Sequence, residues 1–174
     1  MMQRVLSLDI ATTTGWAFNF VQTIDKFEYG LIKTNPKHSE GKRLAYFRKE
    51  LIKLISKFNP THVVIEDIYS GINVKTLKLL AKYAGVAQEC CVSFANIDPY
   101  IIHTSTVKAY FKAKNKRQLF DFAVTLLNWD TNVINFKNHN DIVDSICQLI
   151  CYCDKVLGVK KYREEKDYGY LYKL

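Results

Sequence analysis

Four acidic residues in this sequence have the types and spacing to form one metal-binding catalytic site. Asp9 ends the apolar run VLSLDI and Glu66 ends VVIE, and a charge within an apolar strand is costly unless it is paired, protonated or bound to a metal. Because side chains alternate along a strand, Glu66 and Asp67 face opposite ways, and we select Glu66 for the site. Asp141 and Asp144 are three residues apart at the expected start of a helix, so they project from nearly one face.

Carboxylates from three separate elements supply the oxygen ligands that hard divalent cations prefer. Four such acids can hold two Mg²⁺ ions, with Mn²⁺ as a substitute. Two ions about 4 Å apart can activate a water on one side of a phosphodiester and stabilise the leaving oxygen on the other. We therefore expect metal-dependent phosphodiester hydrolysis without a small-molecule cofactor.

Each acid taken alone also has a structural explanation. Asp9 could cap the turn at 12–14. Asp141 and Asp144 could interact with the positive end of a helix dipole, with Asn140 as the N-cap. Only the combination of the four acids favours a single site over these alternatives.

The charge balance favours a polyanionic partner. Lysine and arginine outnumber aspartate and glutamate by 25 to 17, which gives a formal net charge of +8. Such a surplus attracts nucleic acid, although a solubilising surface would look the same by charge alone.

The sequence shows no sign of export or of a membrane span. The first ten residues lack a long apolar region with a small-residue cleavage site, and no window reaches the roughly 18 to 20 apolar residues that a span needs. The five cysteines form no pair of zinc-type knuckles, so we expect reduced, partly buried thiols. A cytoplasmic protein with no membrane partner is expected.

The hydrophobic pattern predicts an α/β domain with a mixed sheet flanked by helices. Strands are expected at 5–10, 15–21, 27–34, 62–65 and 100–103, and helices at 41–58, 73–94, from 105, at 118–127 and at 140–156. With no internal repeat and no Gly-, Pro- or Ser-rich linker, residues 1–158 are predicted to form one domain, followed by a basic, Tyr-rich tail at 159–174.

The order of the motifs resembles the RuvC family of Holliday junction resolvases, which belong to the ribonuclease H-like nucleases. The segments that carry the resemblance are LSLDIATTTGWAF at 6–18, VVIEDIYSGINVKTLKLLAKYAGVA at 63–87, TVKAYF at 106–111, KNKRQL at 114–119 and NDIVDSICQLICY at 140–152. They span most of the chain in family order. The Lys-, Asn-, Ile- and Tyr-rich composition would suit a phage- or virus-borne member, which would act in the host cytoplasm.

This resemblance implies a ribonuclease H-like sheet of five strands, three antiparallel and then two parallel. It implies that Asp9, Glu66, Asp141 and Asp144 bind the metals. The enzyme would cut two symmetrically placed phosphodiesters in a four-way DNA junction, leaving a 5′-phosphate and a 3′-hydroxyl. It would act as a homodimer that pairs through the helix at 73–94, whose narrow face of small residues is consistent with close helix packing.

Further residues match substrate-contacting positions of that family. Tyr69 would stack on a base near the branch point. Lys108, as part of the catalytic set, and Lys116 match basic family positions near the scissile strand, where a cation would stabilise developing charge on the phosphate. The neighbouring Lys112, Lys114 and Arg117 suggest that Lys116 belongs to a phosphate-binding stripe. The alternatives are an ordinary loop aromatic and a solvated charged face.

Two other functions remain open at this point. A related nuclease could act on branched DNA more broadly or on structured RNA. An ATP-binding protein of the actin and sugar-kinase type would also begin with a strand, an Asp and a Thr-rich turn, as in LSLDIATTTG, but that fold requires two large lobes.

The residues Ile10, Ala11 and Thr12 depart from the Pro-Gly-Ser run of many RuvC relatives, so the family's cutting preference is not transferred. His139, two residues before Asp141, could donate a proton at the site or simply lie in an exposed loop.

Overall fold

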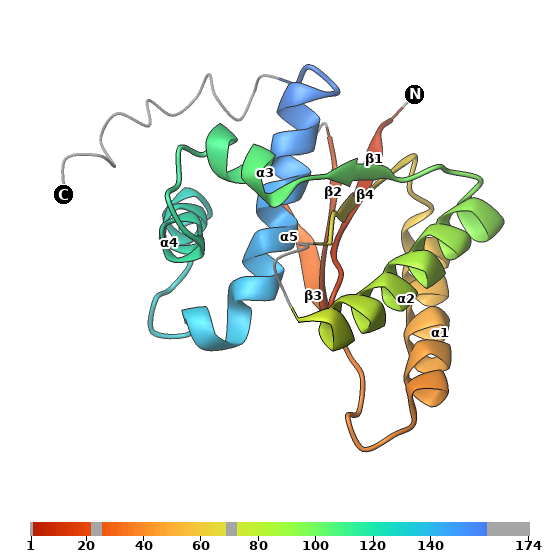
Figure 1. The fold of residues 1–174 in the computed structure, drawn as a ribbon. Coiled ribbons are helices and arrows are strands. Elements are labelled where there is room, and N and C mark those ends of the chain that lie inside the picture. Colours follow the sequence, from red (N-terminus) through yellow and green to blue (C-terminus); the bar gives the residue numbers. More distant parts are fainter. Residues whose placement is uncertain (1, 22–25, 69–72, 160–174) are drawn as a thin grey trace.

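A five-stranded sheet lies between two layers of helices in the computed structural model, which describes residues 2–21, 26–68 and 73–159 (Figure 1). The strands are β1 (Arg4–Asp9), β2 (Thr13–Phe20), β3 (Glu28–Lys33), β4 (His62–Glu66) and β5 (Tyr100–Ile102). The helices are α1 (Glu40–Phe58), α2 (Val74–Cys90), α3 (Thr104–Tyr110), α4 (Lys116–Leu126) and α5 (Phe136–Lys155), and a π-helical segment at Cys91–Ala95 continues α2.

The strand order is β3-β2-β1-β4-β5. β1 pairs with β2, and β2 with β3, in antiparallel orientation, whereas β4 runs parallel to both β1 and β5. The predicted mixed sheet of three antiparallel and two parallel strands is therefore confirmed. Because β1 and β4 are parallel neighbours, their carboxyl ends meet at the same edge of the sheet, where Asp9 and Glu66 lie.

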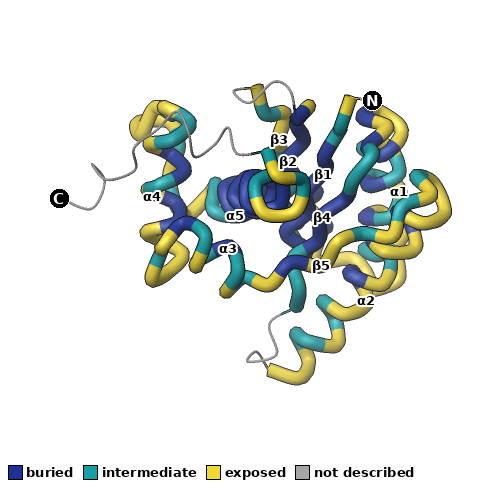
Figure 2. The backbone as a smooth tube through the Cα atoms, turned by 90° about the horizontal axis from the view of Figure 1, so that it is seen from above, coloured by how far each residue is buried: buried dark blue, intermediate teal, exposed yellow. Residues whose placement is uncertain are grey.

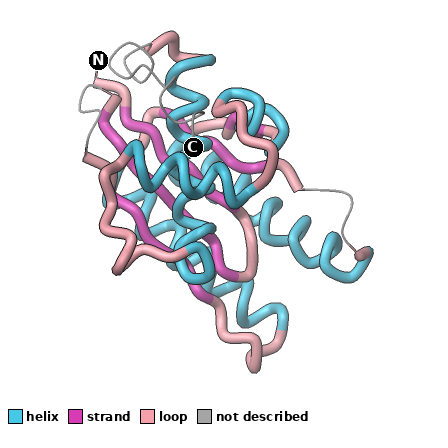
Figure 3. Tube along the Cα trace, turned by 90° about the vertical axis from the view of Figure 1, so that its left-hand side faces the viewer, coloured by secondary structure: helices cyan, strands magenta, loops and turns pink. Residues whose placement is uncertain are grey.

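The strands, magenta in Figure 3, lie between helices. The alternation of side chains along the strands divides the core into two parts, one on each face of the sheet. Leu6 and Leu8 of β1 pack beneath α1 and α2, together with Phe47 and Tyr83 of those helices. The intervening residues of β1 face α5. Asp9 alternates with Leu8 and so belongs with these intervening residues, and its side chain points to the α5 side of the sheet.

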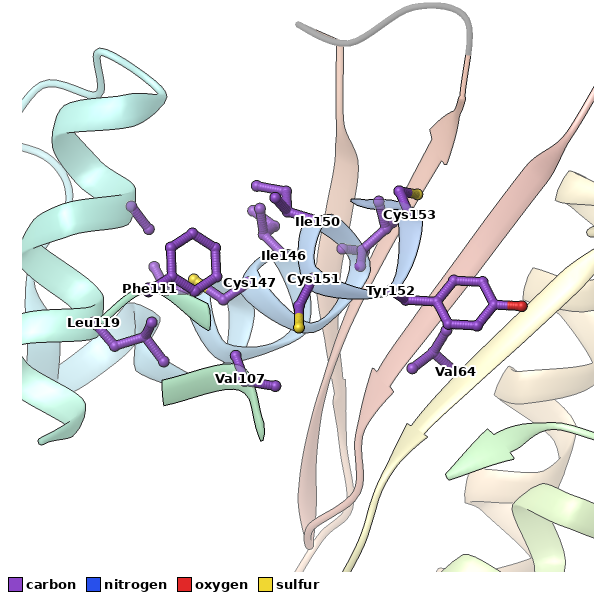
Figure 4. Close-up of a cluster of buried hydrophobic side chains, with 14 of the residues drawn as sticks. Val64, Val107, Phe111, Leu119, Ile146, Cys147, Ile150, Cys151, Tyr152 and Cys153 are labelled. Carbon is purple, nitrogen blue, oxygen red and sulfur yellow. The ribbon is translucent and has the colours of Figure 1, made fainter. Parts of the chain in front are cut away.

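α5 is the central helix of the second layer. Every residue from Ile142 to Cys153 is buried, because the sheet covers one side of the helix and α3 and α4 cover the other (Figure 2). Figure 4 shows this packing, with Cys147 of α5 beside Phe111, and with Val107 of α3 and Leu119 of α4 in the same cluster. A helix enclosed in this way holds its side chains in fixed positions relative to the strand ends.

The boundaries of α5 correct one prediction. The helix begins at Phe136, not at 140, and its N-cap is Asn135, whose side chain accepts a hydrogen bond from the amide of Asn138. Asn140 is therefore not the N-cap. Asp141 and Asp144 lie beyond the first turn, where the dipole effect has faded, so helix capping does not explain these two acids.

α4 also begins earlier than predicted. Its N-cap is Asn115, whose side chain accepts from the amide of Gln118. Lys116 and Arg117 consequently lie in the first helical turn, where the macrodipole disfavours cations. Their positions must be stabilised by side-chain contacts, which are described below.

The five cysteines are free and buried, in agreement with the sequence-based expectation. No helix in the described parts of the chain has both the length and the apolar character needed to cross a membrane. The predicted Tyr-rich tail lies outside the described residues except for Val159, so the domain boundary at 158 stays a prediction.

Candidate active site

The parallel pairing of β1 and β4 brings the first two acids together. Leu8 of β1 is in register with Ile65 of β4, so Asp9 and Glu66 occupy the next position on neighbouring strands. The two side chains are close enough for Glu66 to raise the pKa of Asp9 through its charge and through a side-chain hydrogen bond. Two strand-end carboxylates that are far apart in sequence therefore form one acidic pair.

A glycine on β2 lets α5 approach this pair. Gly15 lies directly opposite Asp9 in the β1–β2 register, and a Cβ atom at Gly15 would lie only 2.0 Å from the carbonyl oxygen of Asp141. The backbones of β2 and α5 are thus in direct contact, which glycine alone permits. This contact sets Asp141 and Asp144 beside the strand ends. Sequence reasoning missed Gly15, although a glycine inside a strand pattern signals a close backbone approach.

Burial and nearby acids raise the pKa of three members of this cluster, Asp9, Asp141 and Asp144. The pKa of Asp9 is well above its ordinary value because the side chain is buried and because Glu66 and Asp144 are close. Burial also raises the pKa of Asp144 and of the half-buried Asp141. The cluster thus carries an excess of negative charge that a cation would relieve.

Lys116 supplies part of the missing positive charge. Its Nζ lies 2.7 Å from Oδ2 of Asp144, whose side chain is only 8% exposed. Burial lowers the pKa of the Lys116 ammonium, but Asp144, followed by Asp9 and Glu66, outweighs this effect and leaves the pKa raised. This ion pair offsets the unfavourable position of a lysine in the first turn of α4.

Glu66 is held by two side chains that sequence reasoning did not identify. The hydroxyl of Thr104 donates to Oε1 of Glu66, and Nε2 of Gln148 donates to Oε2 at 2.7 Å. The Gln148 carboxamide in turn accepts a hydrogen bond of 3.2 Å from the hydroxyl of Ser7. A glutamine between apolar residues of a predicted helix, one turn after Asp144, was the available signal.

Three of the four acids, all except the buried Asp144, line a cleft of about 800 Å³. Both Lys108 and Lys116 line it, so two of the predicted basic residues lie beside the acidic cluster. Asp67 also lines the cleft, and its Oδ2 lies 2.9 Å from Nδ1 of His103. The lining residues from the site are Asp9, Glu66, Asp141, Thr104, Lys108 and Lys116.

Other predicted residues lie elsewhere. Arg117 forms an ion pair with Asp121 and does not line the cleft. The exposed Lys112 and Lys114 are in the connection between α3 and α4, and Tyr69 falls outside the described residues. The ring of His139 contacts the backbone of Asn135, with Nδ1 3.2 Å from the amide nitrogen.

The donor set fits a hard divalent cation. As the side chains lie, no three acidic, histidine or cysteine side chains among the described residues surround a single ion position. Lys116 occupies one oxygen of Asp144, and Thr104 and Gln148 bind Glu66. The raised pKa of Asp9, caused by burial and by its acidic neighbours, indicates a place where added positive charge is favourable.

A pH dependence follows from these shifts. The raised pKa keeps Asp9 protonated over a range where an ordinary carboxyl is ionised, and a metal ion bound by Asp9 would displace that proton. The apparent affinity for Mn²⁺ is therefore expected to rise with pH, by up to about tenfold per pH unit for each proton released. Calorimetric titration with Mn²⁺ from pH 5 to pH 8 measures this, and an affinity that is constant across the range would contradict it.

Comparison with protein families matches residues 11–152 to the family described as crossover junction endodeoxyribonuclease RuvC. The match includes Glu66, Asp141 and Asp144, and Asp9 lies two residues before it. The chain is 30% identical over 164 residues to the RuvC of Rickettsia akari, covering 90% of this chain and 99% of the relative. It is 29% identical over 131 residues to the RuvC of Alkaliphilus oremlandii, covering 72% and 75%.

Solved structures share the fold at lower identity. Thermus thermophilus RuvC in complex with a Holliday junction substrate superimposes with a TM-score of 0.70 at 14% identity, covering 86% of this chain and 94% of that one. The yeast mitochondrial Holliday junction resolvase Ydc2 gives a TM-score of 0.63 at 16% identity, covering 93% and 82%. The nucleotide-binding alternative is not favoured by these comparisons. By its sequence match over most of its length, the chain belongs to the RuvC family of crossover junction endodeoxyribonucleases.

Proposed function

We propose that this chain is a Holliday junction resolvase that cuts two symmetrically placed strands of a four-way DNA junction by metal-dependent hydrolysis. The observation that carries the proposal is the convergence of Asp9, Glu66, Asp141 and Asp144 from β1, β4 and α5 beside a cleft lined by two lysines. Membership of the RuvC family supports the same activity.

The four carboxylates are proposed to hold two Mg²⁺ ions, for which Mn²⁺ can substitute. When bound, the ions supply a water nucleophile and stabilise the leaving oxygen. Asp9 and Glu66 form the strand side of the site, and Asp141 and Asp144 form the helix side. Because the backbones of β2 and α5 touch at Gly15, the elements that carry these two sides are held close together.

Lysines in the cleft are proposed to bind the scissile phosphate. Lys108 and Lys116 lie among the lining residues, and a cation there stabilises the charge that develops on the phosphate. Tyr69, Lys112, Lys114 and Arg117 remain proposed substrate contacts. The net charge of +8 supports binding through the phosphate backbone.

Two symmetrical cuts require two active sites, so we propose a homodimer that pairs through α2. The small-residue face of this helix serves two surfaces. Ala84, Ala87 and Cys91 pack into the chain's own core, whereas Ala81 is exposed and Leu77 is half-buried. Of these residues, only Ala81 and Leu77 are available to a partner subunit.

Lys116→Met tests the cation of the cleft. We expect the rate of junction cleavage to fall about 10- to 100-fold, because the phosphate loses a cation that contacts the acidic cluster. The metal-free protein should also lose about 1 to 2 kcal/mol of unfolding free energy, since the buried Asp144 loses its counter-ion. Single-turnover cleavage and urea unfolding measure the two effects.

The stability control is Arg117→Met, whose exposed pair with Asp121 should contribute less than about 0.5 kcal/mol. Equal stabilities of the two variants would show that the Lys116 pair is no stronger than a surface pair.

The substrate preference is tested with a panel of labelled DNA and RNA. The wild-type protein is incubated with Mg²⁺ and a four-way junction, a replication fork, a flap, a linear duplex or structured RNA. We expect paired, symmetrical nicks on the junction and cleavage at least about tenfold slower on the others. Equal rates on forks and flaps would favour the broader branched-DNA nuclease, cleavage of RNA would favour the structured-RNA alternative, and single uncoordinated nicks would contradict the homodimer.

A further inference from the structure

A buried hydrogen-bond chain connects the three elements that carry the acids. The Ser7 hydroxyl on β1 donates to Oε1 of Gln148 on α5 at 3.2 Å, and Nε2 of Gln148 donates to Oε2 of Glu66 on β4 at 2.7 Å. Ser7 is fully buried and Gln148 is 2% exposed. This hydrogen-bond chain therefore lies within the protein, behind the cleft.

The chemistry of the groups fixes the direction of this chain. An ionised Glu66 carboxylate can only accept, so the Gln148 carboxamide must present its NH₂ group to it. The carboxamide oxygen then faces Ser7, whose hydroxyl is the donor. Ser7 thus selects the orientation of the amide that binds Glu66.

Ser7 and Gln148 each lie close in sequence to one of the catalytic acids. Ser7 is two residues before Asp9 on the same face of β1, and Gln148 is one turn after Asp144 on α5. Cys147 and Leu149, which flank Gln148 in α5, are buried apolar residues, and a buried amide is costly unless its hydrogen bonds are made. Its hydrogen bonds run to Glu66 and Ser7 and not to a surface group.

We infer that Gln148 is a positioning residue, oriented by Ser7, that holds the Glu66 carboxylate in the conformation needed to bind a divalent metal. The Thr104 hydroxyl donates to the other carboxylate oxygen from the cleft side. Gln148 acts from the buried side and stays in place when an ion or substrate enters the cleft. This inference rests on the proposed metal site.

Gln148→Leu removes the donor at nearly constant volume, and Ser7→Ala removes only the group that orients it. The matched control is Ser145→Ala, which removes another fully buried hydroxyl from α5, one that donates to the backbone carbonyl of Ile142. Binding of Mn²⁺ in the absence of DNA is measured by calorimetry, and folding by thermal unfolding. Junction cleavage is measured as a function of Mn²⁺ concentration.

Relative to wild type, we expect Gln148→Leu to weaken Mn²⁺ binding about 10-fold or more and Ser7→Ala to weaken it about 3- to 10-fold. Ser145→Ala should leave Mn²⁺ binding unchanged. At saturating Mn²⁺ the cleavage rate of the Ser7→Ala variant should return to within about threefold of wild type, since the ligands themselves are intact. The double variant should bind Mn²⁺ no more weakly than Gln148→Leu, because the two residues act in series.

Three results would overturn the inference. They are wild-type Mn²⁺ affinity in a folded Gln148→Leu, wild-type affinity in Ser7→Ala, or additive losses in the double variant. If Gln148→Leu does not fold, Ser7→Ala decides the question alone. A wild-type protein that binds no Mn²⁺ would refute the proposed metal site itself. If wild type binds Mn²⁺ and cleaves the junction, and the variants bind Mn²⁺ as tightly as wild type, only the role of Gln148 would be refuted.

Discussion

Replacing Asp9 by asparagine is expected to abolish junction cleavage and, at the same time, to make the metal-free protein more stable. Asp9 is buried, and its pKa is raised by burial and then by Glu66 and Asp144. An asparagine keeps the shape and removes the charge. Cleavage should fall by at least about 10²- to 10³-fold, whereas the unfolding free energy without metal should rise by roughly 1 to 2 kcal/mol at pH 8.

The pH dependence of stability separates this account from a merely structural role. Because the folded-state pKa of Asp9 is above its unfolded value, the native state binds the extra proton. Stability of the metal-free wild type therefore decreases as pH rises from the ordinary carboxyl pKa through the raised one. Urea unfolding in EDTA between pH 5 and pH 8 should show this slope in wild type and a weaker slope in Asp9→Asn. A variant that is less stable at every pH would show that Asp9 serves the fold.

Gly15→Ala is expected to disrupt the site from a position that bears no chemistry. The new Cβ would lie 2.0 Å from the carbonyl oxygen of Asp141 and 2.4 Å from its carbonyl carbon, so α5 must move away from β2. We expect a loss of about 3 kcal/mol or more in unfolding free energy and a loss of Mn²⁺ binding of at least about 10-fold in the protein that remains folded.

The matched control is Gly41→Ala in α1, where a Cβ would meet no atom within 4 Å. That substitution should stabilise the protein by about 0.4 to 1 kcal/mol, because alanine favours the helix. Thermal unfolding and Mn²⁺ calorimetry of both variants give the comparison. Wild-type stability and wild-type metal affinity in Gly15→Ala would mean that α5 can shift without consequence for the acids.

The fold could be predicted from the sequence where the pattern is local. Strand-length apolar runs, amphipathic periods and the order of motifs gave the mixed sheet and its five strands. The start of α5 was misplaced because Asn135 and Asn140 are both good N-cap residues. The structure places the cap at Asn135, where Phe136 also packs against Phe120 with ring centroids 5.4 Å apart.

The acids could be proposed from the sequence, because carboxylates at the ends of apolar strands are conspicuous. Their supporting residues could not. Gly15 matters through a backbone contact with Asp141, which is distant in sequence. Gln148 and Ser7 matter through hydrogen bonds that span three elements. Such long-range contacts leave no periodic signal, so only the folded structure reveals them.

The most direct test of the central claim is a Mg²⁺ titration of four-way junction cleavage by wild type and Glu66→Gln side by side. Glu66 is chosen because it is hydrogen bonded to both Thr104 and Gln148, and glutamine preserves its shape. We predict symmetrical cleavage by wild type that requires Mg²⁺ and stops in EDTA, and no detectable cleavage by the variant at any Mg²⁺ concentration. Cleavage by wild type in EDTA, or undiminished cleavage by Glu66→Gln, would contradict the assignment of these acids to a metal-dependent active site.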